Sequence, residues 1–103
     1  MKPLVSLRDA LTDSSAVVRI EAAAALVELD DAAESLRVLQ DELRSSRPDV
    51  ALHAARALQL LGDRARPVWP AMREVCERAR REEPTVGDGA MFLRFSLESA
   101  LEQ

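Results

Sequence analysis

The chain has 103 residues, enough for one small domain, and its 48% hydrophobic content is too high for a disordered protein. Its 14 Lys and Arg against 18 Asp and Glu give a net charge of −4, which argues against a generic nucleic-acid-binding surface. The single cysteine excludes an internal disulfide, and no apolar run approaches the roughly 20 residues that span a bilayer.

Helical spacing of apolar residues begins close to the N-terminus. It predicts a short helix over residues 3–12 and a second helix over residues 16–29, with Ser15 as the N-cap of the second. A third, amphipathic helix is predicted over residues 32–44. These three helices follow one another with short polar turns between them.

The second half of the chain continues in the same way. A fourth helix is predicted over residues 48–61, with Pro48 in its first turn and Gly62 at its end. A fifth helix is expected to begin near Ala65 or Pro67 and to fade in a charged run. Residues 84–89 have no helical period and predict a loop, after which a last helix is expected over residues 90–102.

The second and fourth helices repeat each other at an offset of 32 residues. The matching positions are Val18 with Val50, Ala22 with Ala54, Ala23 with Ala55, Ala25 with Ala57, Leu26 with Leu58, and Leu29 with Leu61. In the last helix, Leu93 and Leu97 stand where Val50 and Ala54 stand in the fourth. One helix cannot bury such a stripe alone, so the sequence predicts three helix pairs that stack and share a core.

The repeated unit resembles the HEAT repeat, in its short bacterial variety. The resemblance rests on L-x-x-x-L followed by D-x-x-x-x-V-R-x-x-A-A-x-A-L, which begins at Leu7. It implies an all-α fold, a right-handed α-α superhelix or solenoid of three HEAT-like helix pairs. It also implies a single HEAT-like repeat domain over residues 1–103, with repeats at about 3–30, 32–62 and 65–103.

In the HEAT family, an Asp of the turn and the Arg six residues later form a ladder between repeats. The resemblance therefore implies ladder pairs of Asp13 with Arg19 and of Asp88 with Arg94. The middle unit has Ser45 and Ala51 at these positions, so we expect the ladder to be broken there. Ordinary surface charges are the alternative interpretation.

The end of the chain has a second resemblance. Residues 62–72 and 90–101 are similar to the C-terminal helical tail of a group of bacterial sulfatases. The sulfatase nucleophile motif, C-x-P-S-R or its serine form, is not present around Cys76. If the parent is a sulfatase, its chemistry belongs to residues that this chain does not contain.

A second apolar row lies almost opposite the predicted stripe. Ile20, Leu52 and Phe95 occupy equivalent positions, where such repeats usually carry a polar residue. The candidate docking residues on this concave side are Ile20, Ala24, Val27, Leu52, Arg56 and Phe95. Two interpretations stay open: these side chains fill the space between repeats, or they dock another domain or protein.

Few residues are suited to catalysis. Hydrolysis or metal chemistry would need a nucleophile, a base and an orienting group in one place. The single histidine, His53, is expected to be solvated or to cap a helix, and Cys76 is expected to lie in the core. We therefore expect no enzymatic activity, no cofactor and no metal site.

These observations predict a non-catalytic scaffold or protein-interaction module. The expected partner is a protein, either the parent's catalytic domain or another subunit, and not a nucleic acid or a membrane. One alternative is a free-standing adaptor that resembles the phycobilisome-lyase type of HEAT protein. Another is a HEAT-fold protein that binds alkylated DNA, which the acidity and the few aromatics disfavour. A sulfatase parent would imply a periplasmic or secreted protein, and otherwise we expect a cytoplasmic one.

Overall fold

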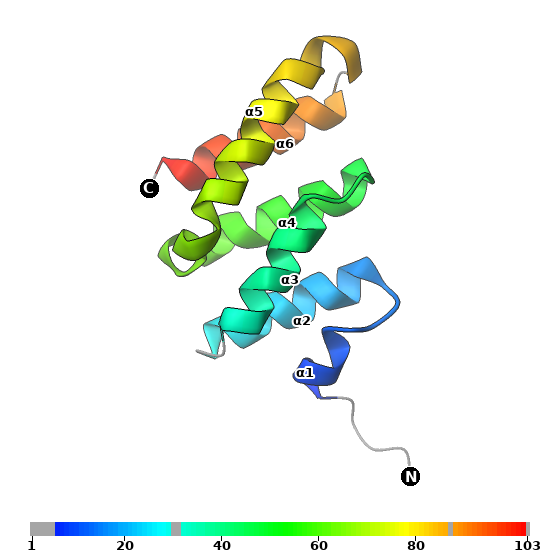
Figure 1. Cartoon of the computed structure of the whole chain (residues 1–103), viewed down its shortest axis with the longest axis vertical. Coiled ribbons are helices and arrows are strands. Elements are labelled where there is room, and N and C mark those ends of the chain that lie inside the picture. The colour runs from blue at the N-terminus through cyan, green and yellow to red at the C-terminus, as the bar shows by residue number, and fades with distance from the viewer. Residues whose placement is uncertain (1–5, 30–31, 87, 103) are drawn as a thin grey trace.

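The computed structural model of the protein describes residues 6–29, 32–86 and 88–102, with the backbone alone at 83–86 and 88. Every regular element within these ranges is a helix, which confirms the all-α prediction. In chain order the elements are α1 (Leu7–Ala10), α2 (Ala16–Glu28), α3 (Ala33–Leu43), α4 (Pro48–Leu61), the 3-10 helix η1 (Gly62–Val68), α5 (Trp69–Val86) and α6 (Asp88–Leu101) (Figure 1).

The ends of the helices follow local signals in the sequence. The Ser15 hydroxyl accepts a hydrogen bond of 3.4 Å from the Val18 amide, which confirms Ser15 as the N-cap of α2. Pro48 occupies the first turn of α4, where a missing amide hydrogen costs no helical hydrogen bond. Gly62 ends α4 with a φ of 57°, in a region that favours glycine.

The first and third helices are shorter than expected. The helix predicted over residues 3–12 is observed as the four residues of α1, with residues 3–5 outside the described range. The helix predicted over residues 32–44 loses one residue at each end in α3. Such differences of one or two residues are normal at helix ends, which fray.

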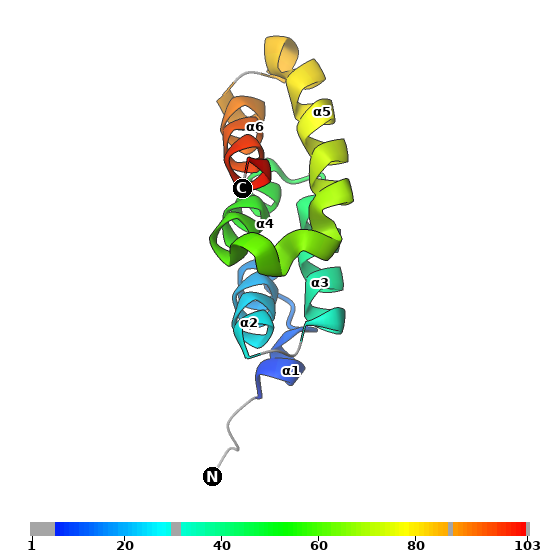
Figure 2. The ribbon, with the colours of Figure 1, turned by 90° about the vertical axis from the view of Figure 1, so that its left-hand side faces the viewer.

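The helices form two layers along the 52 Å long axis of the molecule (Figure 2). One layer contains α2, α4 and α6 in this order, and the other contains α3 and α5. Packing within pairs joins α3 to α4 and α5 to α6, and packing between pairs joins α2 to α4 and α4 to α6. Within the described residues, α4 is thus the central helix of its layer, and α2 and α6 are its two ends.

The hydrophobic core lies where the helices of the two layers meet. The buried residues of α4 are Val50, Ala51, Ala54, Ala55, Leu58 and Leu61, and the stripe predicted for α4 is therefore largely confirmed. The stripe predicted for α2 is partly wrong, because Val18 and Leu29 are exposed. Figure 1 shows α4 on one side of α2 and, in the described part of the chain, only the short α1 on the other.

The entry into the third pair is more irregular than predicted. The chain continues past Gly62 as a 3-10 helix, and α5 begins at Trp69 and not near Ala65 or Pro67. Pro67 and Pro70 explain this delay, because neither can donate the amide hydrogen bond of a continuous α-helix. Pro70 lies in the first turn of α5, where it is tolerated.

The stretch over residues 84–89 was predicted to be a loop, and this prediction is wrong for most of it. Helix α5 extends to Val86, and α6 begins at Asp88. The preceding residues Arg81 and Glu82 are exposed. A helical turn that projects into solvent needs no apolar residue, so it leaves no apolar period in the sequence.

Candidate functional site

The predicted docking row begins with two residues that a partner cannot reach. Ile20 and Val27 belong to the hydrophobic core, and both side chains are almost fully buried. The expectation that these two line an accessible concave surface is therefore corrected. For them the structure favours the other interpretation, in which they fill space inside the stack.

The other members of the row become more accessible toward the C-terminus. Ala24 and Leu52 are half-buried, whereas Arg56 and Phe95 are exposed. At the three equivalent positions, Ile20 on α2 is buried, Leu52 on α4 is partly covered and Phe95 on α6 is open. This gradient follows the layer, because α4 follows α2, α6 follows α4, and no further described helix follows α6.

The exposed end of the row carries both phenylalanines of the chain. Phe92 is 46% exposed and Phe95 is 50% exposed, and residues three apart lie side by side on a helix surface. We call these two side chains the α6 aromatic face. Phe92 was not among the predicted docking residues, although its spacing of three from Phe95 could have indicated it.

The edge of the α6 aromatic face is charged. The guanidinium of Arg94 lies 4.6 Å from the centre of the Phe95 ring, within the range of a cation–π interaction. The Arg94 Nη1 also donates a hydrogen bond of 2.7 Å to the Glu98 carboxylate. The aromatic face thus has an apolar centre and a polar margin.

The first predicted ladder pair is only partly as expected. Arg19 Nη1 donates to the backbone carbonyl of Asp13 at 2.8 Å, and not to its carboxylate. The carboxylate instead accepts a hydrogen bond of 2.8 Å from the Ser15 amide, ahead of α2. Arg19 Nε donates to Glu42 of α3 at 2.7 Å, so this arginine does connect one helix pair to the next.

The rest of the ladder can be followed only in part. The side chain of Asp88 lies outside the described residues, so its predicted pairing with Arg94 stays a prediction. In the middle unit, the Ser45 hydroxyl accepts a hydrogen bond of 3.1 Å from the Arg47 amide. Ala51 stands where an arginine would continue the ladder, and it is buried in the core.

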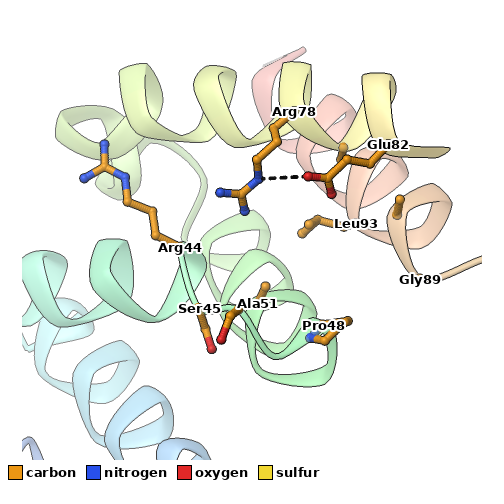
Figure 3. Close-up of a pocket in the computed structure, with 11 residues that line it drawn as sticks. Arg44, Ser45, Pro48, Ala51, Arg78, Glu82, Gly89 and Leu93 are labelled. Atoms are coloured by element: carbon orange, nitrogen blue, oxygen red, sulfur yellow. Dashed lines mark ion pairs between the residues drawn. The ribbon is translucent and has the colours of Figure 1, made fainter. Parts of the chain in front are cut away.

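A pocket of about 480 Å³ lies between the second and third helix pairs (Figure 3). It lies where the C-terminal half of α5 and the first turns of α6 face the turn between α3 and α4. Figure 3 shows Arg78 and Glu82 of α5 above the pocket, with Pro48 of α4 and Leu93 of α6 opposite them. The pocket is therefore bounded by three helices and one turn, from two successive helix pairs.

The pocket wall is apolar with a charged margin. Its lining residues are Arg44, Ser45, Ser46, Pro48, Ala51, Arg78, Ala79, Glu82, Gly89, Ala90 and Leu93. The Arg78 Nε is 3.9 Å from the Glu82 carboxylate, and Arg44 Nη2 is 3.4 Å from the carboxylate of Glu74. The described lining residues include two serines and no histidine that could activate them.

The remaining groups of interest also take part in packing. His53 Nε2 lies 2.8 Å from the Glu21 carboxylate and links α4 to α2 at equivalent positions of the repeat. Cys76 is buried, and this desolvation raises the pKa of its thiol above the usual value, with the nearby Glu98 carboxylate acting in the same direction. A neutral, buried thiol is a poor nucleophile.

The described part of the chain has neither a metal-binding cluster nor a membrane-spanning helix. There, no three His, Cys, Asp or Glu side chains come together in a way that could hold a metal ion. None of the described helices combines the length and the apolar character needed to cross a bilayer.

Comparison of the chain with models of protein families, with curated proteins and with solved structures finds no match.

Proposed function

We propose that the chain is a non-catalytic HEAT-like repeat module that docks a partner protein through the α6 aromatic face. In this proposal the three helix pairs form a right-handed superhelical stack. The sequence repeat at an offset of 32 residues and the two layers of helices support the stack. The position of the phenylalanines supports the docking.

One observation carries the proposal. The chain has only three aromatic residues, one Trp and two Phe, and both phenylalanines are half exposed on neighbouring positions of one helix. Full burial of a phenylalanine side chain contributes roughly 1.5 to 3 kcal/mol, so two half-exposed rings leave much of this free energy for association. Aromatic side chains are enriched at the centres of protein interfaces.

The surroundings of the two rings fit the same proposal. Interfaces commonly have an apolar centre and a polar margin, and the ion pair between Arg94 and Glu98 provides such a margin beside Phe95. Arg56, from the predicted docking row, adds an exposed charge on α4. The partner is thus a protein whose contact surface is apolar at its centre.

The wider context is also part of the proposal. The resemblance of residues 62–72 and 90–101 to a sulfatase tail makes the catalytic domain of a bacterial sulfatase the first partner to consider. The genomic reading frame upstream of Met1 tests this idea directly. A C-x-P-S-R motif there, or its serine form, would support it, and a reading frame without either would remove it.

Proximity labelling in the native host tests the docking surface itself. Two forms of the chain would be expressed, the unchanged chain and the double variant Phe92→Ser, Phe95→Ser. The proteins that each form labels would then be compared. We expect at least one protein to lose labelling in the double variant, and its purified form should bind the intact chain directly.

Leu60→Ser is the matched control. Leu60 is an apolar residue on α4 that is 87% exposed but lies outside the α6 aromatic face. This variant should label the same proteins as the unchanged chain, and circular dichroism should show that all three proteins are equally helical. Identical labelling by the control and the double variant would contradict docking through the two phenylalanines.

A further inference from the structure

The pocket between the second and third helix pairs has a counterpart one repeat earlier that an arginine side chain crosses. Ser45, in the turn before α4, corresponds to Asp13 at the offset of 32 residues, and Ala51 corresponds to Arg19. The Arg19 side chain reaches from the Asp13 carbonyl to the Glu42 carboxylate of α3, and so joins the first pair to the second. Alanine at position 51 is too short to cross the next junction, and the pocket lies there.

The positive charge at this second junction comes from the opposite wall. Figure 3 shows the Arg78 side chain pointing from α5 into the pocket, toward the wall that contains Ser45 and Ala51. Its Nε is 3.9 Å from the Glu82 carboxylate, which is too long for a hydrogen bond. A guanidinium has five N–H donors and can hold a carboxylate with two of them. Arg78 therefore presents donors that a carboxylate in the pocket can use.

The rest of the pocket wall is mainly apolar. Ala51, Ala79, Ala90 and Leu93 line it, and all four belong to the hydrophobic core. The volume of about 480 Å³ lies in the range of small-molecule sites, which is roughly 300 to 1,000 Å³. The described lining contains no aromatic ring on which a planar ligand would stack. Its shape and chemistry suit an aliphatic chain.

Arg78 is the less compensated of the two arginines in the described lining. Arg44 donates a hydrogen bond of 3.4 Å to Glu74, whereas the pair of Arg78 with Glu82 is longer and the Glu82 side chain is half exposed. Exposed ion pairs are weakened by water, and pairs that are shielded from water are stronger. A carboxylate that approaches Arg78 from the apolar side of the pocket would form the better shielded pair.

We propose that this pocket binds an amphipathic aliphatic carboxylate, such as a medium-chain fatty acid. The carboxylate pairs with Arg78, and the chain lies against Ala51, Ala90 and Leu93. Neither phenylalanine lines the pocket, so this site is separate from the α6 aromatic face. The inference goes beyond the proposed function and can fail without it.

Isothermal titration calorimetry of the 103-residue chain with decanoate at neutral pH tests the inference. We expect a single site with a Kd below about 1 mM. Arg78→Met retains an aliphatic side chain but removes the charge, so it should weaken binding about tenfold or more. Arg73→Met removes an exposed charge of α5 outside the pocket and should bind decanoate as the unchanged chain does.

Gly89 allows a variant that fills the pocket. A Cβ at this position would lie 3.8 Å from the Pro48 Cβ, an ordinary van der Waals contact, and both residues line the pocket. Gly89→Leu should therefore weaken decanoate binding about tenfold or more, because its side chain takes up space that the ligand needs. Gly89→Ala is the matched control and should retain most of the binding. Circular dichroism checks that both variants are equally helical.

The charge of the ligand provides a test that needs no variant. Decyltrimethylammonium has a similar chain and the opposite charge, so the unchanged chain should bind it at least about tenfold more weakly than decanoate. Equal binding of the two ligands would show that only the apolar chain is recognised, and would overturn the inference. Decanoate binding that is unaffected by Arg78→Met or by Gly89→Leu would also overturn it.

Two further outcomes separate this inference from the proposed function. The Phe92→Ser, Phe95→Ser variant should bind decanoate as the unchanged chain does, and loss of binding in it would place the ligand on the α6 aromatic face instead. An unchanged chain that binds no decanoate at concentrations up to about 10 mM overturns the inference. Neither result changes which proteins the two phenylalanines are expected to dock.

Discussion

Helices α2 and α4 have nearly the same apolar pattern but different neighbours. Val18 on α2 is 39% exposed, and Val50 at the same position of α4 is 6% exposed. The difference is larger at the next matching pair, where Leu29 is 68% exposed and Leu61 is 7% exposed. Identical side chains on equivalent positions therefore contribute differently to the core.

The second apolar row shows the opposite order. Ile20 on α2 is fully buried, and Leu52 on α4 is only partly covered. If α2 were simply less well packed, both rows would be more exposed on it. The two rows together show instead that α2 is packed on one side and open on the other, whereas α4 is covered on both.

The largest effect that this comparison predicts is at the leucine pair. Leu61→Ala should lower the free energy of unfolding by about 2 kcal/mol or more, because it removes buried methyl groups and leaves a cavity. Leu29→Ala should cost less than about 0.5 kcal/mol, because that side chain is mostly in water. Urea denaturation of the unchanged chain and of each variant measures both losses.

Equal losses in the two variants would contradict the open face of α2. A large loss for Leu29→Ala would mean that another segment covers this side chain in solution. A small loss for Leu61→Ala would mean that α2 and α4 are not packed as described. Unchanged denaturant slopes in both variants would show that the denatured states are comparable.

The second apolar row predicts a smaller difference in the free energy of unfolding, and here the variant on α2 is the more costly one. Ile20→Ala should cost about 2 to 5 kcal/mol, because Ile20 is fully buried. Leu52→Ala should cost roughly half as much, since Leu52 is already partly in contact with water. The same denaturation experiment measures this pair. A greater cost for Leu52→Ala than for Ile20→Ala would contradict the assignment of a buried and an exposed side to α2.

Much of the fold could be predicted because its signals are local. Ser15 has the residue type and position of an N-cap, and Gly62 has those of a helix end. The stripe of α4 could be predicted because apolar residues at helical spacing must face some other element. These features depend on a few neighbouring residues, and the sequence contains all of them.

The rest depended on neighbours that periodicity does not reveal. The spacing identified Val18 and Leu29 as apolar positions but could not tell that both side chains are exposed on α2. For the candidate site, it found Phe95 but also placed Ile20 on the surface. The HEAT resemblance implied that Arg19 pairs with Asp13, but it does not decide whether a carbonyl or a carboxylate oxygen accepts the hydrogen bond.

The smallest predicted effect compares the N-termini of the same two helices. Ser15 caps α2 with its hydroxyl, whereas the side chain of Arg47, the N-cap of α4, makes no capping hydrogen bond to a backbone amide of the helix. Ser15→Ala should therefore cost about 0.5 to 1 kcal/mol, and Arg47→Ser should add a similar amount. Arg47 already has the extended backbone of an N-cap residue, with φ −89° and ψ 115°, so a serine there needs no rearrangement.

Arg47→Ala separates the new cap from the loss of the arginine. Arg47 pairs with Asp49 at 3.5 Å on the surface, and such an exposed pair contributes little. The alanine variant should therefore change stability only slightly, and the serine variant should exceed it. If the two variants are equally stable, the hydroxyl does not cap α4. If serine does stabilise, α4 gains stability from its local sequence in addition to its neighbours.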